Sequence, residues 1–320
     1  MNARVCTNPN CYQHEGETCP LGHLAPAAEC DAMKKGAPRK SAPAPSAIAQ
    51  QARVPWSGSA LGLDDLFLLA SRARHLLIGV IGAHDSGKTT LLTANYLKIL
   101  ESGVLADRTF SGSWTLGAWE SLAAWMRFQD KREPSFPPHT PRGTGRVPGM
   151  LHLALRSRSV GFRDVFFTDA PGEWFSRWAI KEDAPDAEGA RWVVQHSDAF
   201  LIAADSERLS GANRGPARSE LRQLLERLGN HIDGRPAILV WTKSEHTVPD
   251  GIRQSITEAL KANLPQAVEL SSSVSAPGTF VDVLAAIVLS AWEGKVTPPI
   301  IEPISVATPF WAFRGHDGQT

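Results

Sequence analysis

The sequence predicts an α/β fold in which a mainly parallel sheet of six strands is covered by helices on both faces. From about Trp56 onward, short runs of β-branched and apolar residues alternate with segments whose apolar residues recur at helical spacing. At 320 residues, the chain also exceeds the roughly 100 to 200 residues of a typical domain. We therefore expect one large α/β domain that carries a smaller appendage.

Six apolar runs are predicted strands, and four segments with helical spacing are predicted helices. The expected strands span residues 75–81, 150–156, 162–168, 199–204, 237–242 and 267–270. The expected helices span residues 87–100, 216–228, 251–263 and 279–292. About eighty residues separate Thr89 from Asp169, and helical spacing recurs within them at 114–129. We interpret residues 107–149 as an insertion into the domain.

Composition divides the chain into four parts. Residues 1–31 are rich in Cys and His, and residues 32–55 are dominated by Ala, Pro, Ser, Lys and Arg, which is typical of a linker. The α/β domain is expected at 56–295, and a C-terminal tail at 296–320. No internal repeat is evident.

Charge and hydropathy indicate a cytoplasmic protein. The 33 basic and 33 acidic residues balance, so no overall field favours nucleic acid as a partner. The longest apolar stretch near the C-terminus, 281–292, contains Asp282 and is shorter than the roughly 20 residues of a membrane span. The N-terminus lacks the apolar segment of a secretory signal.

The segment that follows the first expected strand has the pattern of a phosphate-binding loop. Its sequence, GAHDSGKT, matches G-x-x-x-x-G-K-[ST] between a strand and a helix, as a P-loop requires. Glycines let backbone N–H groups approach a phosphate, and the helix N-terminus favours the anion. Lys88 is expected to reach the β- and γ-phosphates, and the Thr89 hydroxyl to bind Mg²⁺. The predicted nucleotide contacts here are Gly82, His84, Asp85, Ser86, Gly87, Lys88, Thr89 and Thr90.

A second acidic motif, D-x-x-G, ends the strand expected at 162–168. Asp169 is predicted to hold Mg²⁺ through a water, and the Gly172 N–H to meet the γ-phosphate. Glu173 stands where a residue that orients the attacking water would be expected, although it could equally be a solvated loop charge. Residues 139–146 are interpreted as a first switch loop, in which a threonine would complete the Mg²⁺ shell. Thr140 is preferred over Thr144 for this role. The catalytic candidates are therefore Lys88, Glu173 and Thr140.

The strand expected at 237–242 leads into a candidate base-binding motif. Thr242, Lys243 and Glu245 resemble the [NT]-K-x-D motif of Ras-like and translation-factor-related GTPases, in which the carboxylate accepts two hydrogen bonds from guanine. Adenine lacks that pair of N–H groups, so this site would select GTP over ATP. Glu245 departs from the family's Asp by one methylene. Downstream, Ser271 and Ser272 resemble the [ST]-A-K loop of the same family, without its lysine.

The four motifs follow the order found in P-loop GTPases of the translation-factor-related and Ras-like class, over roughly residues 60–293. The spacing of Cys6, Cys11 and Cys19, the run 169–175 and the insertion further resemble bacterial double-GTPase proteins of conflict systems. The resemblance implies a GTP-hydrolysing molecular switch that uses GTP or GDP and Mg²⁺, with a second GTPase or effector proteins as partners. The alternatives are a nucleotide-binding adaptor with little turnover, or a P-loop ATPase or kinase.

All four cysteines lie near the N-terminus and predict a zinc site. Cys6, Cys11, Cys19 and Cys30 would supply one tetrahedral Zn²⁺ in a segment too short to fold by burial alone. Substitution of His14 or His23 for Cys30 is the alternative ligand set.

Overall fold

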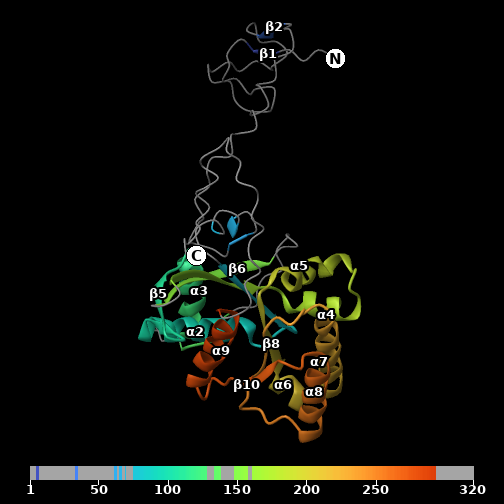
Figure 1. Cartoon of the computed structure of the whole chain (residues 1–320). Coiled ribbons are helices and arrows are strands. Elements are labelled where there is room, and N and C mark those ends of the chain that lie inside the picture. Colours follow the sequence, from blue (N-terminus) through green and yellow to red (C-terminus); the bar gives the residue numbers. More distant parts are fainter. Residues whose placement is uncertain are drawn as a thin grey trace, which may run out of the picture. The chain divides into compact units, whose positions relative to one another are not determined.

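The computed structural model of the chain describes residues 5–6, 33–34, 61–62, 65–66, 69, 75–127, 133–137, 148–157 and 161–292. The chain divides into two units, Met1–Val54 and Pro55–Thr320. In the first unit, β1 (Val5–Cys6) pairs antiparallel with β2 (Met33–Lys34). The second unit contains a large sheet with helices on both faces (Figure 1).

Eight strands form this sheet, in the order β10-β9-β8-β3-β7-β6-β5-β4. Neighbouring strands from β10 to β7 pair in parallel, whereas β7, β6, β5 and β4 pair antiparallel. The strands are β3 (His75–Gly82), β4 (Val104–Leu105), β5 (Arg108–Gly112), β6 (Gly149–Ser157), β7 (Gly161–Asp169), β8 (Ala199–Asp205), β9 (Ala237–Thr242) and β10 (Val268–Ser271).

The predicted α/β class is confirmed, but the predicted sheet of six mainly parallel strands is wrong: the sheet has eight strands, and β6 runs antiparallel to β7. All six expected strands occur, but only three residues, 158–160, join β6 to β7. A connection this short permits a hairpin and excludes the long crossover that parallel neighbours need. The two further strands, β4 and β5, extend the edge beyond β6. They have two and five residues, too few for a clear hydropathy pattern.

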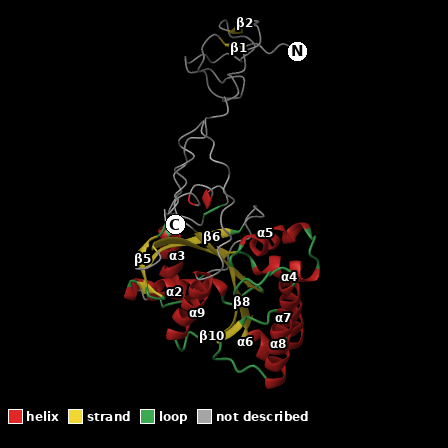
Figure 2. Ribbon diagram, viewed as in Figure 1, coloured by secondary structure: helices red, strands yellow, loops and turns green. Residues whose placement is uncertain are grey.

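Helices cover the two faces of the sheet in separate groups (Figure 2). One face carries α2 (Lys88–Ser102), α3 (Leu116–Met126) and α9 (Gly278–Trp292). The other carries α4 (Gly172–Ile180), α5 (Glu188–His196), α7 (Arg214–Gly229) and α8 (Asp250–Asn263). Alternate residues of the buried strand β3 serve the two cores: Ile78 and Val80 pack under the first group, and Ile81 under the second.

The four expected helices occur with ends within two residues of the prediction, as α2, α7, α8 and α9. The segment with helical spacing at 114–129 contains α3. Helices α4 and α5 were not predicted from the sequence, and each has only nine residues. The short helix α6 (Ser206–Ser210) and the 3₁₀ turn Pro185–Ala187 were not predicted either.

Hydrogen bonds to His152 of β6 hold the segment between β5 and α3 on the sheet. The Trp119 indole donates to the His152 carbonyl at 2.8 Å, and the Trp114 backbone N–H donates to His152 Nδ1 at 2.9 Å. Because Nδ1 accepts this bond, Nε2 carries the proton and donates to Asp164 at 2.8 Å, in a fully buried pair. Within the described parts of the chain, no helix has the length and apolarity needed to cross a bilayer.

Candidate functional site

The phosphate-loop sequence forms a tight turn between β3 and α2. Gly82 has φ +154°, and a Cβ there would lie 3.0 Å from the Ala203 carbonyl oxygen, so the loop passes directly against β8. Gly87 has φ +80° and is the residue before α2, whose first residue is Lys88. Both positions favour glycine, because positive φ is unfavourable for residues with a side chain. The turn therefore points the free N–H groups of the α2 N-terminus into the loop.

Lys88 folds back over this loop. Its ammonium donates to the carbonyls of Ala83 at 2.7 Å and Gly82 at 3.2 Å, and the residue is only 8% exposed. Burial lowers the pKa of Lys88 to about 8, although the charges of Asp169 and Glu173 oppose the shift. The buried ammonium thus depends on the loop carbonyls and on nearby carboxylates for its stabilisation.

The structure brings Thr89 and Asp169 together from positions far apart in the sequence. The Thr89 hydroxyl donates to Asp169 Oδ1 at 3.2 Å, from the first turn of α2 to the end of β7. Strands β3 and β7 are parallel neighbours, so their carboxyl ends lie at one edge of the sheet. A hydroxyl and a carboxylate at this distance are oxygen ligands of the kind that Mg²⁺ prefers.

Gly172 lies against the phosphate-loop backbone. A Cβ at this position would lie 2.3 Å from the carbonyl carbon of Ala83 and 2.3 Å from the His84 nitrogen, which no side chain could tolerate. Gly172 is the first residue of α4, and Glu173 follows it. Glu173 Oε1 lies 3.4 Å from His84 Nδ1 at the tip of the loop. The D-x-x-G segment and the loop therefore pack in direct contact.

An open, polar cavity lies between these two segments. Pro137 adds a contact from the insertion. The lining residues are His84, Asp85, Ser86, Gly87, Lys88, Thr89, Thr90, Pro137, Ala170, Pro171, Gly172 and Glu173. They include every predicted phosphate-loop contact except Gly82, and two of the three predicted residues of the D-x-x-G side, Gly172 and Glu173; the third, Asp169, is not among them. Thr140, the predicted first-switch residue, lies outside the described residues.

The segment after β9 joins the phosphate loop through side chains. The buried Thr242 hydroxyl donates to the Ser86 carbonyl at 2.8 Å. Lys243, with φ +52°, directs its ammonium to Asp205 at 3.1 Å and Glu207 at 2.8 Å, with Asp85 at 3.9 Å. Burial lowers the pKa of Lys243, but the hydrogen bond with Glu207 and the charge of Asp205 outweigh it, so the pKa lies above its ordinary value.

Glu245 pairs with a serine that follows β10. The Ser273 hydroxyl donates to Glu245 Oε2 at 2.6 Å, so the carboxylate is held beside the serine run. Ser271 ends β10 and is exposed, whereas Ser272 is 1% exposed and its backbone bonds to Trp241 and Ser244. The two loops proposed to bind the base are therefore adjacent, and the serine in contact with Glu245 is the third of the run.

A family model named Double-GTPase 2 matches residues 76–292, which is more than half of the chain. The chain belongs to the Double-GTPase 2 family. This match confirms the resemblance to double-GTPase proteins that the motifs indicated. The family's name describes GTPases and so suggests GTP binding. A comparison with curated proteins found no significant match.

Two acidic residues of this Double-GTPase 2 domain were missed by the sequence analysis. Asp205 ends β8 and is 5% exposed; its Oδ1 accepts hydrogen bonds from the N–H groups of Glu207 and Arg208, and its Oδ2 pairs with Lys243. Glu207 is the second partner of Lys243. One signal was available in the sequence: Asp205 follows a buried apolar run, as Asp169 does.

The zinc prediction has no support in the structure. Of the four cysteines, Cys11, Cys19 and Cys30 lie outside the described residues, and only the backbone of Cys6 is described, in β1. Among the residues that are described, no group of three or more His, Cys, Asp or Glu side chains is placed to hold a metal ion. Thr89 and Asp169 do not form a group of this kind, because Asp169 is the one residue of the pair that belongs to these four types.

Proposed function

We propose that this chain binds GTP or GDP with Mg²⁺ in the cavity beside the phosphate loop and hydrolyses GTP to GDP and phosphate. The observation that carries the proposal is the approach of Thr89, which lines the polar cavity, to Asp169 at 3.2 Å. Two residues eighty positions apart meet there with the donor types that a magnesium–phosphate group requires. The family match over 76–292 supports the same class of nucleotide.

The protein residues have separate roles in this proposal. The loop Gly82–Thr89 offers backbone N–H groups to the phosphates, and Lys88 exchanges the carbonyls of Gly82 and Ala83 for phosphate oxygens. Thr89 and Asp169 would hold Mg²⁺, which neutralises phosphate charge when bound. The role of Thr140 as a third protein ligand of that ion stays a prediction.

Glu173 is the residue we assign to the attacking water. It stands next to Gly172, lines the cavity and lies 3.4 Å from His84 on the opposite wall. A carboxylate in this position accepts a hydrogen bond from a water and can orient it toward a phosphate held by the loop. The alternative, a solvated charge without a role in turnover, predicts that Glu173→Ala, which removes the hydrogen-bond acceptor, hydrolyses GTP at the wild-type rate.

Guanine would be recognised by Glu245, with Lys243 beside it. Both carboxylate oxygens can accept hydrogen bonds, as guanine requires, and Ser273 orients one of them. Glu245→Gln replaces one acceptor by a donor, so we expect GDP affinity to fall at least about tenfold while ADP affinity changes little. Glu226→Gln is the matched control, because Glu226 is exposed on α7.

Two measurements on the purified full-length chain test the proposal. A competition titration of GDP against ADP should give tighter GDP binding, and tighter ADP binding would favour an ATPase or kinase instead. Release of phosphate from GTP, measured alone and with a candidate partner GTPase, distinguishes the switch from the adaptor. Binding without release in both conditions would identify an adaptor.

A role in a bacterial conflict system is also part of this hypothesis. The resemblance to conflict-system double GTPases supports a switch whose loops near Thr140 and Glu173 are read by a second GTPase or an effector. We retain the cytoplasmic location, the boundaries 1–31, 32–55, 56–295 and 296–320, and zinc bound by the N-terminal cysteines as parts of this hypothesis.

A further inference from the structure

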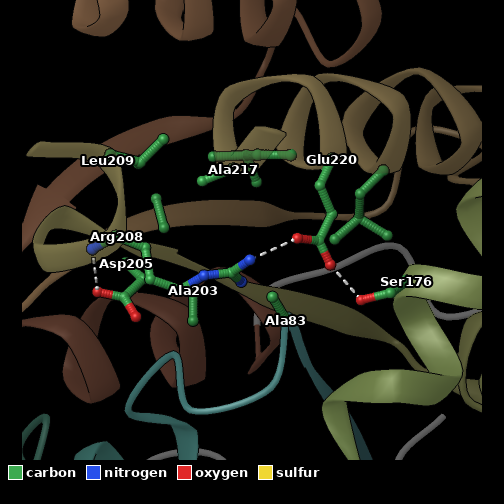
Figure 3. A pocket seen from close by; sticks show the side chains of 11 residues that line it. Ala83, Ser176, Ala203, Asp205, Arg208, Leu209, Ala217 and Glu220 are labelled. Carbon is green, nitrogen blue, oxygen red and sulfur yellow. Dashed lines mark hydrogen bonds and ion pairs between the residues drawn. The ribbon is translucent and has the colours of Figure 1, made fainter. Parts of the chain in front are cut away.

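Three helices on one face of the sheet meet through a single carboxylate, that of Glu220 on α7. Ser176 of α4 donates a hydrogen bond to Glu220 Oε1, and Arg208 of α6 donates to Glu220 Oε2 at 3.0 Å. Figure 3 shows both bonds converging on Glu220. We call Ser176, Arg208 and Glu220 the Glu220 clamp. Its ion pair is only partly exposed, with side-chain exposures of 36% for Arg208 and 27% for Glu220.

The clamp acts on the face of α4 that meets the nucleotide cavity. Ser176 lies three and four residues after Glu173 and Gly172, so all three share one face of the helix. Gly172 packs on the Ala83 and His84 backbone, and Glu173 faces His84. Any rotation of α4 that moves Ser176 therefore moves Glu173 relative to the phosphate loop.

Apolar packing fixes the opposite side of α4 and leaves the Ser176 side open. Phe175 and Trp178 are buried in the core shared with α5 and α7. The Ser176 side faces a narrow cleft (Figure 3). Four alanines and three leucines contribute to its lining: Ala83, Ala203, Ala204, Ala217, Leu209, Leu221 and Leu224. The polar clamp crosses this cleft and joins α4 to α7 and α6 by hydrogen bonds.

The far end of the clamp is anchored in turn. Asp205 accepts hydrogen bonds from the N–H groups of Glu207 and Arg208, which fixes the start of α6 and the backbone that carries the Arg208 side chain. Asp205 also pairs with Lys243 of the proposed base loop at 3.1 Å. A continuous set of hydrogen bonds thus links Lys243 to Ser176.

We propose that Glu220 is a positioning residue: through Ser176 it sets the rotation of α4, and so holds Glu173 over the phosphate loop for hydrolysis. This inference rests on the proposed function. It requires Glu220 to affect turnover while leaving nucleotide affinity almost unchanged, because no clamp residue lines the nucleotide cavity.

The test compares Glu220→Ala, Ser176→Ala and the double variant in the full-length chain. We expect each single variant to lower the rate of GTP hydrolysis on the order of tenfold, and the double variant to lose no more than the worse single one. GDP affinity should stay within about threefold of wild type. Without nucleotide, amide hydrogen exchange in Trp174–Ile180 should be faster in all three variants. Glu226→Ala is the control: Glu226 is also on α7 but is exposed, and its substitution should leave every readout at the wild-type value.

Specific results would overturn the inference. Wild-type hydrolysis and exchange in Ser176→Ala would do so, as would losses in the two single variants that add fully in the double variant. If Glu220→Ala does not fold, Ser176→Ala decides, because alanine preserves the helix. If the wild-type chain releases no phosphate, the proposed hydrolysis fails, while the exchange measurement still tests whether the clamp restrains α4.

Discussion

Replacing Gly172 by alanine would test whether α4 must touch the phosphate loop. The added Cβ would lie 2.3 Å from two backbone atoms of that loop, and ordinary contact begins near 3.4 Å. The first turn of α4 must therefore retreat by about 1 Å, because the neighbours are main-chain atoms and cannot rotate away.

The magnitude follows from that displacement. Overpacking of this kind costs about 1–3 kcal/mol, and in a domain of this size each kcal/mol lowers Tm by roughly 2–4 °C. Turnover should suffer more, since a misplacement of about 1 Å can reduce a rate about a hundredfold. GDP binding, which depends on the loop itself, should change less than about threefold.

The assay pairs thermal unfolding with phosphate release under saturating GTP. Gly251→Ala is the matched control: Gly251 also lies in the first turn of a helix, α8, but a Cβ there meets nothing within 4 Å. The control should be neutral or slightly more stable, by about 0.4–1 kcal/mol. A Gly172→Ala protein with wild-type Tm and wild-type hydrolysis would refute the close approach of α4 to the loop.

Four further predictions concern the proposed metal ions and the buried lysine. Lys88→Ala should abolish nucleotide binding and leave the fold intact by circular dichroism; unchanged affinity would argue against the phosphate loop. In the wild type, nucleotide phosphates should favour charged Lys88, whose pKa burial lowers to about 8. Binding should therefore take up a proton and weaken as the pH rises above 8, which calorimetry in two buffers of different ionisation enthalpy can measure. Asp169→Asn should remove most of the Mg²⁺ dependence of GTP affinity, and an unchanged dependence would exclude Asp169 as a ligand. Metal analysis of the full-length chain should find about one zinc, lost in Cys11→Ser, whereas a metal-free wild type would remove the zinc site.

The site could be predicted from the sequence where its chemistry is local. The phosphate loop needs glycines at Gly82 and Gly87 and a lysine at fixed spacing, and the structure gives both glycines positive φ. The expected strands and long helices also occur, since hydropathy period is a property of neighbouring residues. By contrast, the sequence indicated the serine run as part of the base site, but it did not show that Ser273 is the serine that contacts Glu245.

The motifs, their order, and the approximate ends of the buried strands and long helices could all be read from the amino-acid sequence. Three features required the folded structure: the antiparallel pairing of β6 with β7, the pairing of Lys243 with Asp205 and Glu207, and the link from α4 to α6 through Glu220. The physical reason is distance along the chain. Periodicity and turn chemistry act over a few residues, whereas these pairings depend on which strands and helices become neighbours when the two cores close.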